Sequence, residues 1–334
     1  MKKTTNAEDK ALDLFAEMMI EKIQSIQTNW HQPWFSGGIT MPKNLAGRYY
    51  NGMNSLMLMM HTEKCGYKTS RYATFDTIKK LNEGNDSDDE KNTFVHVLKG
   101  EHSFPVFLTM FIVSQKSTGK RISYTEYNAL PAEEQNDYNV FPRQRLYYVF
   151  NLDQTNLKEK RPELWDKILK EDMIEKPVND TSFCIPQVDT MIDEQSWLCP
   201  IRMQENRAYY STTLDFINVP SKENFENGES FYSTLFHEMG HSTGKESCLN
   251  RNIMNSFGSS DYAKEELIAE LTAALTCQQF AIEKHVNDES AAYIKSWLAC
   301  LKKNPEFIKD VLKDVRRAHT TIMCELNKQK VVAV

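Results

Sequence analysis

The sequence predicts an α+β protein of two domains. The N-terminal domain mixes helices with strands, and the C-terminal domain is mainly helical with a small sheet. A chain of 334 residues is longer than a single hydrophobic core usually spans. Runs that are typical of strands predominate before residue 155, whereas helical patterns surround a His-Glu-x-x-His motif at residues 237–241. We therefore expect domains at residues 1–155 and 196–334.

Residues 156–195 mix charged residues with Pro and Asn, and we expect them to form a connector with one short helix. The net charge of −6 gives no sign of nucleic-acid binding by the chain as a whole. Acidic residues are in excess only after residue 150. A nucleic-acid site would therefore be a local patch in the N-terminal domain.

The cysteines and the hydropathy pattern favour a cytoplasmic protein. The 7 cysteines are scattered and include no C-x-x-C pair, which is typical of reduced thiols and not of a disulfide framework or a zinc ribbon. No apolar run resembles a signal peptide or approaches the length of a transmembrane helix. We therefore expect a cytoplasmic location and no membrane partner.

The first predicted element is a helix over residues 7–27, followed by an aromatic loop at residues 30–35. Large apolar residues recur along one face of this helix, at Leu12, Phe15, Met19, Ile23 and Ile26. The aromatic side chains of the loop either fill the core beneath the helix or offer stacking surfaces to nucleobases. Trp34 is the candidate for stacking.

Three polar segments of the N-terminal domain predict a single-stranded-DNA patch. In residues 44–54, glycines that permit positive φ flank an Arg-Tyr-Tyr-Asn core. Residues 67–72 repeat this chemistry before a helix at 75–81, and a turn at 99–102 separates strand-like runs at 94–98 and 104–113; a further strand is expected at 146–152. Arginine and lysine suit phosphate contacts, and tyrosine suits base stacking. The candidates are Arg48, Tyr49, Tyr50, Asn51, Arg71 and Lys99.

The motif His237-Glu238-Met239-Gly240-His241 predicts a metal site on a helix. Two histidines four residues apart lie on the same helix face, so both imidazoles can reach one ion. Glu238 is then the candidate general base, acting on a metal-bound water. Zn²⁺ is the expected ion because imidazole and carboxylate ligands suit it. Phe231, Leu235 and Met239 form a separate apolar stripe, which we expect to pack.

A catalytic zinc site needs a third protein ligand, and the helix expected over residues 261–275 offers three candidates. Glu266 and Glu270 share the flank of its apolar face, while Glu265 is expected to point towards solvent. We assign Glu266 as the third ligand, which makes the site gluzincin-like, and Glu270 as the acceptor of the second ring N–H of a liganding histidine. The reverse assignment of these two residues stays open. An acid at Glu265 also remains an alternative.

These segments together resemble the ArdC-type antirestriction proteins of mobile elements. The matching segments are residues 44–54, 67–75, 99–101, 149–154, 237–244 and 262–270, in the family's order along nearly the whole chain. The resemblance implies an N-terminal single-stranded-DNA-binding domain and a C-terminal zincin-like metallopeptidase domain. It also implies that His237, His241 and an acid of the 265–270 helix hold zinc, and that the protein protects incoming DNA from host restriction.

Two functional hypotheses follow. In the first, a DNA-binding domain guides a zinc metallopeptidase that hydrolyses a protein or peptide substrate, with Glu238 as the base. In the second, the protein is a non-catalytic shield of single-stranded DNA, and its zinc site is structural or vestigial. The sequence does not identify a peptide substrate or a DNA sequence preference.

Overall fold

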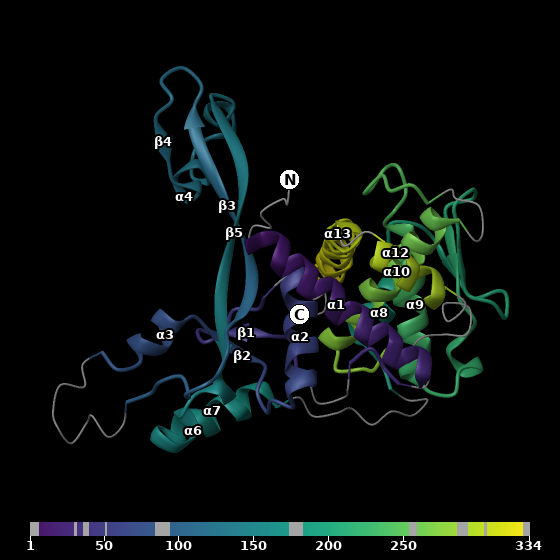
Figure 1. The fold of residues 1–334 in the computed structure, drawn as a ribbon. Coiled ribbons are helices and arrows are strands. Elements are labelled where there is room, and N and C mark those ends of the chain that lie inside the picture. Colours follow the sequence, from purple (N-terminus) through teal and green to yellow (C-terminus); the bar gives the residue numbers. More distant parts are fainter. Residues whose placement is uncertain are drawn as a thin grey trace.

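The computed structural model describes residues 7–29, 32–35, 40–50, 52–83, 94–173, 183–253, 259–285, 293–303 and 306–329. Its α+β architecture combines two sheets with a group of packed helices (Figure 1). The helices are α1 (Ala7–Thr28), α2 (Met53–Cys65), α3 (Phe75–Lys80), α4 (Tyr124–Asn128), α5 (Ala132–Gln135), α6 (Leu157–Lys160), α7 (Pro162–Asp172), α8 (Pro186–Asp193), α9 (Gly228–Ser242), α10 (Ser260–Gln279), α12 (Ile294–Lys303) and α13 (Glu306–Gln329). The strands are β1 (Lys43–Asn44), β2 (Arg71–Ala73), β3 (Phe104–Gln115), β4 (Arg121–Ile122), β5 (Tyr138–Asn151), β6 (Ile201–Arg202), β7 (Tyr209–Ser211) and β8 (Phe216–Asn218), and short 3₁₀ turns lie at η2 (Leu152–Gln154) and η3 (Lys222–Asn224).

The two longest strands, β3 and β5, form an arm that projects from the body of the protein (Figure 1). They pair antiparallel, from Phe104 opposite Val149 to Gln115 opposite Tyr138. The whole sheet has the order β1-β2-β5-β3-β4. The sequence predicted both strands but made them too short, because main-chain pairing and not a hydrophobic pattern keeps residues 138–145 extended.

The strand predicted at residues 94–98 is wrong. This segment makes only an isolated bridge between Val97 and Thr155. Its main chain is held by side-chain amides: Asn82 accepts from the Val95 nitrogen at 2.9 Å, and Asn156 accepts from the His96 nitrogen at 2.8 Å. These bonds satisfy the backbone without a sheet ladder.

One hydrophobic core joins the beginning and the end of the chain. The expected stripe of α1 is buried throughout, and Phe15 and Met19 are fully enclosed. They belong to the same core cluster as Trp297 of α12 and Val311 of α13. Figure 1 shows α1 lying beside these C-terminal helices. Burial against α12 and α13 therefore stabilises the N-terminal helix across the expected domain boundary.

The described residues of the connector expected at 156–195 form three helices, α6, α7 and α8, and not one. Helix α7 buries Trp165 and Ile168 in a small third core. The charged residues that suggested a linker lie on the exposed face of α7, with the exception of Asp172, which is buried and binds the Arg71 guanidinium. Helix α7 is thus packed onto the N-terminal sheet, whereas α8 contributes to the core around α9.

In the C-terminal part, helix α9 carries the His-Glu-x-x-His motif and lies between a small sheet and helix α10. The sheet has the order β6-β8-β7, so β7 is its outer strand on the side that contacts α9. The expected stripe of α9 is buried, with Phe231, Leu235 and Met239 at most 1% exposed. Gly240 lets α9 and α10 approach closely, since a Cβ there would lie 3.2 Å from the Ala269 Cα.

All 7 cysteines lie within the described residues and are free thiols. Among the helices that the structure describes, none is both long enough and apolar enough to cross a membrane.

Candidate metal centre and nucleic-acid interface

Helix α9 presents both histidines of the motif to one point. The helix begins after Asn227, whose side chain accepts a hydrogen bond from the Ser230 nitrogen at 2.9 Å. His237 and His241 are one turn apart, and their Nε2 atoms lie 3.1 Å from each other. His237 is 4% exposed. The helix therefore fixes two imidazole nitrogens around a nearly enclosed space.

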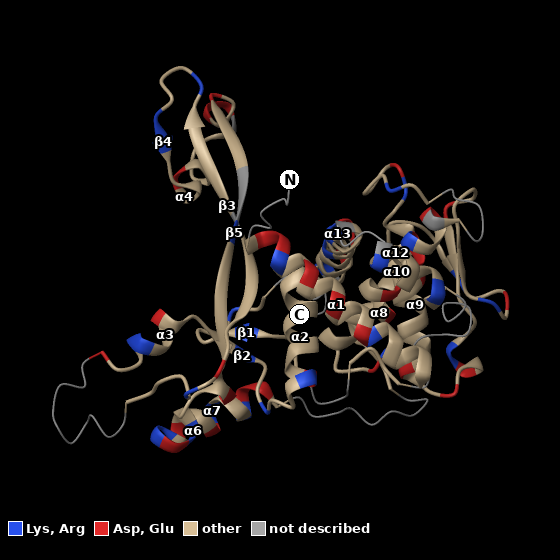
Figure 2. Cartoon of the chain, in the orientation of Figure 1, with Lys and Arg blue, Asp and Glu red and all other residues tan. Residues whose placement is uncertain are grey.

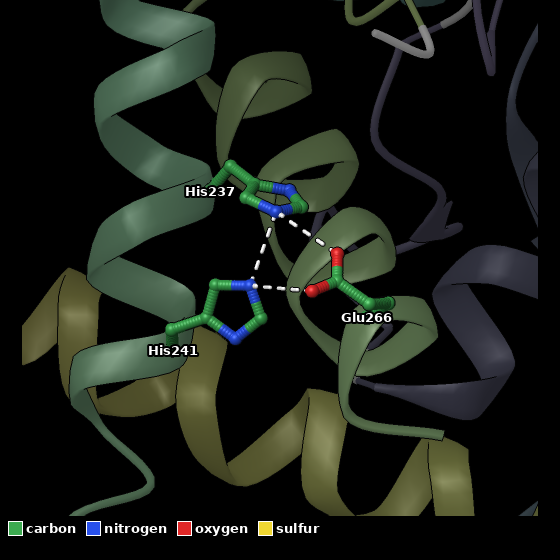
Figure 3. A group of neighbouring side chains, drawn as sticks. All are labelled: His237, His241 and Glu266. Carbon is green, nitrogen blue, oxygen red and sulfur yellow. Dashed lines mark hydrogen bonds and ion pairs between the residues drawn. The ribbon is translucent and has the colours of Figure 1, made fainter. Parts of the chain in front are cut away.

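Helix α10 supplies a carboxylate to the same space. Glu266 places one oxygen 3.6 Å from the His237 Nε2 and the other 3.7 Å from the His241 Nε2 (Figure 3). One ligand atom from each of the three residues fits within a span of 4.8 Å. This is the trio that the sequence proposed as metal ligands, and the structure brings it together.

Two further glutamates of α10 face the outer nitrogens of the same imidazoles. Glu270 lies 3.1 Å from the His237 Nδ1, and Glu265 lies 3.3 Å from the His241 Nδ1. The expectation that Glu265 points to solvent is wrong, because this side chain is 8% exposed and binds the Arg251 guanidinium through both oxygens, at 2.9 and 2.7 Å. The positive charge of Arg251 compensates the Glu265 carboxylate and so makes the burial of Glu265 tolerable.

The donor set fits a divalent cation. With a carboxylate facing each Nδ1, the proton of each neutral imidazole belongs on Nδ1, so two Nε2 lone pairs point into one space beside the Glu266 carboxylate. Four glutamates surround the histidines against two cations, and four minus two leaves two negative charges. An ion of charge +2 would balance them. The glutamates are Glu238, Glu265, Glu266 and Glu270, and the cations are Arg251 and Lys284.

The same electrostatics shift the pKa values of the ligand residues. Burial opposes the charged form of His237, but the carboxylates of Glu266 and Glu270 outweigh it and raise the pKa to about 10. Burial likewise opposes ionisation of Glu266, and the two histidines overcome it and lower its pKa to about 2. Without an ion, the site thus draws protons onto its imidazoles. This is the response expected of a cation site.

Glu238 lies next to the ligands in the chain and close to them in space. Its carboxylate is 7% exposed and accepts a hydrogen bond from the main-chain nitrogen of Tyr210 in β7. Burial raises the pKa of Glu238, while His237 and His241 oppose that rise. A carboxylate with a raised pKa and a fixed orientation is suited to accept and return a proton.

Two of the DNA-contact candidates are buried. Trp34 is 1% exposed and Arg71 is 3% exposed. Trp34 fills the core, which was the alternative to stacking, and its indole donates to Glu270. The Arg71 guanidinium donates to both oxygens of Asp172, at 2.8 and 2.9 Å, so its charge is neutralised inside the protein. The prediction that Trp34 and Arg71 contact DNA is therefore wrong, because both side chains are buried.

The other candidates lie at or near the surface. Arg48 and Lys99 are exposed, and Tyr49 is 52% exposed with the Lys43 ammonium 5.1 Å from its ring centre. Tyr50 is half-buried, and burial raises the pKa of its hydroxyl to about 12. Figure 2 shows basic residues beside β1 and β2 and again around β4. A further candidate, Asn51, lies outside the described residues.

The end of β5 joins two of these polar loops. Asp153 accepts hydrogen bonds from the main-chain nitrogens of Lys68 and Thr69, both at 3.0 Å. Gln154 donates to the His102 carbonyl at 2.8 Å. The loop before β2 and the turn that carries Lys99 are thereby held at the same end of the sheet, beside the end of β5.

The sequence missed three groups that act on the metal centre. Arg251 and Lys284 hold Glu265 and Glu270, and the Tyr262 hydroxyl binds the Glu266 carboxylate. The two cations lie in irregular segments with no periodic pattern to mark them. The tyrosine carried a signal that was not used: it is four residues before Glu266 and therefore shares its helix face.

The fold and the site together define a two-domain protein with a zincin-like metal centre. Residues 9–150 match the N-terminal domain of anti-restriction factor ArdC, and residues 186–311 match a zincin-like metallopeptidase domain. The chain therefore combines an ArdC-type N-terminal domain with a zincin-like metallopeptidase domain, the organisation of the ArdC-type antirestriction proteins. This confirms the resemblance inferred from the sequence, together with its α+β architecture.

Solved structures support the assignment over nearly the whole chain. The metal-free crystal structure of the antirestriction ArdC protein from plasmid R388 is 27% identical, has a TM-score of 0.66, and is matched over 95% of this chain and 98% of that one. The Mn(II)-bound structure of the same protein is 25% identical with a TM-score of 0.64, over 94% and 98% of the two chains. That structure holds Mn(II), so the likeness to it does not single out Zn²⁺.

Curated relatives match by sequence alone. DNA primase TraC of Escherichia coli is 26% identical over 329 residues, which are 95% of this chain and 20% of TraC. An uncharacterized protein, y4eC of Sinorhizobium fredii (strain NBRC 101917 / NGR234), is 27% identical over 297 residues, 87% of this chain and 84% of that protein. The chain therefore spans about a fifth of the length of TraC.

Proposed function

We propose that this antirestriction ArdC-like protein binds single-stranded DNA through its N-terminal part and hydrolyses peptide bonds at a Zn²⁺ centre formed by His237, His241 and Glu266. One observation carries the peptidase half: two Nε2 atoms and a carboxylate converge beside Glu238 in a site with two uncompensated negative charges. The combination of ligands and base is that of a metallopeptidase, and not of a purely structural site in which protein ligands fill every position.

The residues of the chain would divide the work as follows. A divalent ion, when bound, supplies Lewis acidity: it polarises a carbonyl and lowers the pKa of water. Glu238 takes up the proton of the attacking water and returns it to the leaving amine, which its raised pKa favours. The Tyr210 main-chain nitrogen keeps the Glu238 carboxylate in place. The outer strand β7 offers an edge along which an extended peptide can pair.

The peptidase half is tested with Glu238→Gln. This variant keeps the shape of the side chain but cannot accept a proton. We expect the metal content, measured by elemental mass spectrometry, to stay near that of the native protein, and cleavage of a fluorescence-quenched peptide library to fall by about 10²-fold or more. A Glu238→Gln protein that cleaves at the native rate refutes the role of Glu238 as base.

The DNA half rests on the exposed cations and tyrosines of the polar loops. The contacts proposed for single-stranded DNA are Arg48, Tyr49, Tyr50, Asn51 and Lys99. Cations that neutralise phosphates release counterions, so the affinity should fall steeply with salt concentration. Tyr49 supplies a ring that is 52% exposed, with the Lys43 ammonium 5.1 Å from its centre, and aromatic rings of this kind can stack on bases.

The DNA half is tested with Arg48→Ala. We expect weaker binding to labelled oligothymidine at every salt concentration and a salt slope reduced by about 1. Lys302→Ala is the matched control, because Lys302 is an exposed cation on α12, a helix that packs on α1, α10 and α13. Equal losses in the two variants would show that the effect is one of overall charge and not of a site.

A second function stays in contention: a DNA shield whose metal centre only stabilises the fold. Here Glu238→Gln should leave protection of DNA from a restriction enzyme unchanged. Loss of protection in that variant, with DNA binding intact, would favour the peptidase.

A further inference from the structure

Behind the metal centre, the carboxylate of Glu270 uses its two oxygens for different partners. Its Oε1 accepts hydrogen bonds from the Trp34 indole at 3.0 Å and from the Lys284 ammonium at 2.9 Å. Its Oε2 faces the His237 Nδ1 at 3.1 Å. Glu270 is 0% exposed, so water does not compete for either oxygen. Two donors on Oε1 thus fix the plane of the carboxylate and leave Oε2 for the histidine.

The two donors form one structural unit, although 250 residues separate them in the chain. The main-chain nitrogen of Trp34 donates to the main-chain carbonyl of Lys284 at 2.8 Å, and Pro33 forms an antiparallel bridge with His285. Trp34 is 1% exposed and the Lys284 side chain is 3% exposed. A short pairing between the segment after α1 and the segment after α10 therefore delivers both donors to one oxygen.

We infer that Trp34 is a positioning residue of the metal centre, supplied by the part of the chain that also carries the DNA-binding candidates. The inference rests on the metal centre of the proposed function. The Trp34 indole holds the Glu270 carboxylate 3.1 Å from the His237 Nδ1, which favours a proton on that nitrogen and leaves the Nε2 lone pair for the ion. Outer partners of this kind orient a ligand and raise its basicity. The metal centre is thus completed by both halves of the chain.

The alternative is that Trp34 only fills space. Two features argue against it. An indole N–H buried against a carboxylate is a directional bond that packing alone does not require. The other carboxylate of the site is held in the same manner: Arg251, from a segment outside α9 and α10, binds Glu265, which faces His241. Each imidazole therefore faces a carboxylate that is itself held by a donor from outside α9 and α10.

The test compares two tryptophan variants of the full-length chain. Trp34→Phe keeps an aromatic ring but removes the N–H donor. Trp297→Phe is the matched control, because Trp297 lies in the same core cluster, is 0% exposed, and donates its N–H to the Ala263 carbonyl at 2.7 Å and not to an outer carboxylate. The dissociation constant for Zn²⁺ is measured by competition with a fluorescent chelator, beginning from metal-free protein.

We expect Trp34→Phe to weaken Zn²⁺ binding by roughly 10-fold or more, and Trp297→Phe to change it by less than about 2-fold. The Co²⁺-loaded protein gives a second readout, since the visible absorption of Co²⁺ should shift in Trp34→Phe alone. Affinity for labelled oligothymidine should stay native in Trp34→Phe, as the indole is not a stacking surface. The thermal stability of the metal-free proteins is measured in parallel. If Trp34→Phe and Trp297→Phe lower it equally, a loss of metal affinity in Trp34→Phe alone is not a result of general destabilisation.

Three outcomes overturn the inference. Native Zn²⁺ affinity in Trp34→Phe refutes it while leaving the proposed metal centre intact. Equal loss in Trp34→Phe and Trp297→Phe reduces the effect to packing. A native protein that binds neither Zn²⁺ nor Mn²⁺ refutes the metal centre itself and the inference with it. If Trp34→Phe does not fold, Lys284→Met removes the second donor of the same oxygen. Because this change also removes a positive charge, its readout is the visible absorption of bound Co²⁺, which we expect to shift, and an unchanged spectrum would refute the inference.

Discussion

Arg251 offers a direct measure of how the buried charges of this site are balanced. Its side chain is 4% exposed and donates to both oxygens of Glu265, to the Thr243 hydroxyl at 2.9 Å and to the Gly240 carbonyl at 2.8 Å. Arg251→Met keeps an unbranched apolar stem and removes the guanidinium. The buried Glu265 carboxylate then lies next to three other glutamates with only the His241 imidazole as a partner.

Breaking a buried ion pair by removing one partner costs about 3–5 kcal/mol, because the remaining charge is left without compensation. We expect a loss of this size in the free energy of unfolding of Arg251→Met, measured by urea denaturation of the metal-free protein at pH 7. Arg317→Met is the matched control. Arg317 is 44% exposed and lies 3.4 Å from Asp314, so its loss should cost less than about 1 kcal/mol.

The pH dependence gives this prediction a second signature. Burial works to raise the pKa of Glu265, but Arg251 and His241 hold it below its ordinary value. In the native protein this stabilisation is present above the ordinary pKa and is lost as the pH falls through the lowered one. In Arg251→Met the carboxylate protonates more readily, so the cost should shrink from pH 7 to pH 5. A cost below about 1 kcal/mol at pH 7, or one that grows on acidification, would refute the charge argument.

Two other predictions concern His319 on α13 and the contact between α9 and α10. The Nε2 of His319 has no hydrogen-bond partner among the described residues, and burial lowers the pKa of this imidazole to about 4. Because the unfolded histidine takes up a proton near pH 6.5, stability should fall between about pH 6.5 and pH 4, by up to about 3 kcal/mol, and His319→Gln should flatten that part of the pH profile of the urea midpoint. Gly240→Ala should push α9 and α10 apart, since its Cβ would lie 3.2 Å from the Ala269 Cα. We expect the free energy of unfolding to fall by about 1–3 kcal/mol and Zn²⁺ binding to weaken. Native Zn²⁺ affinity would show that the helices adjust without moving His237, His241 and Glu266.

Periodicity accounts for what the sequence predicted well. The stripe of α1 and the stripe of α9 are both buried as expected, because the 3.6-residue repeat is a local property of the chain. The same geometry placed His237 and His241 on one face, and Glu266 with Glu270 on one flank of α10. The separation of those two glutamates by one turn is enough to give them different partners, an Nε2 atom and an Nδ1 atom of the same imidazole.

Charge neutralisation accounts for what the sequence predicted wrongly. An arginine or a glutamate is assumed to be exposed unless a partner is known, and the partners of Arg71 and Glu265 are Asp172 and Arg251. Asp172 lies 101 residues from its partner, and no local pattern marks it. Trp34 illustrates the same limit, since its acceptor on Glu270 is 236 residues away.

Residue identity and spacing were enough to predict the helix that carries His237, Glu238 and His241, the face that the two histidines share, and the resemblance to ArdC-type proteins. All of these depend on residue types at fixed spacing along one helix or one loop. The fold was needed to show which charges are buried, which cations hold Glu265 and Glu270, and that the Trp34 indole binds Glu270 from the other end of the chain. The burial of a charge depends on partners that the fold brings together, and distance along the chain carries no information about them.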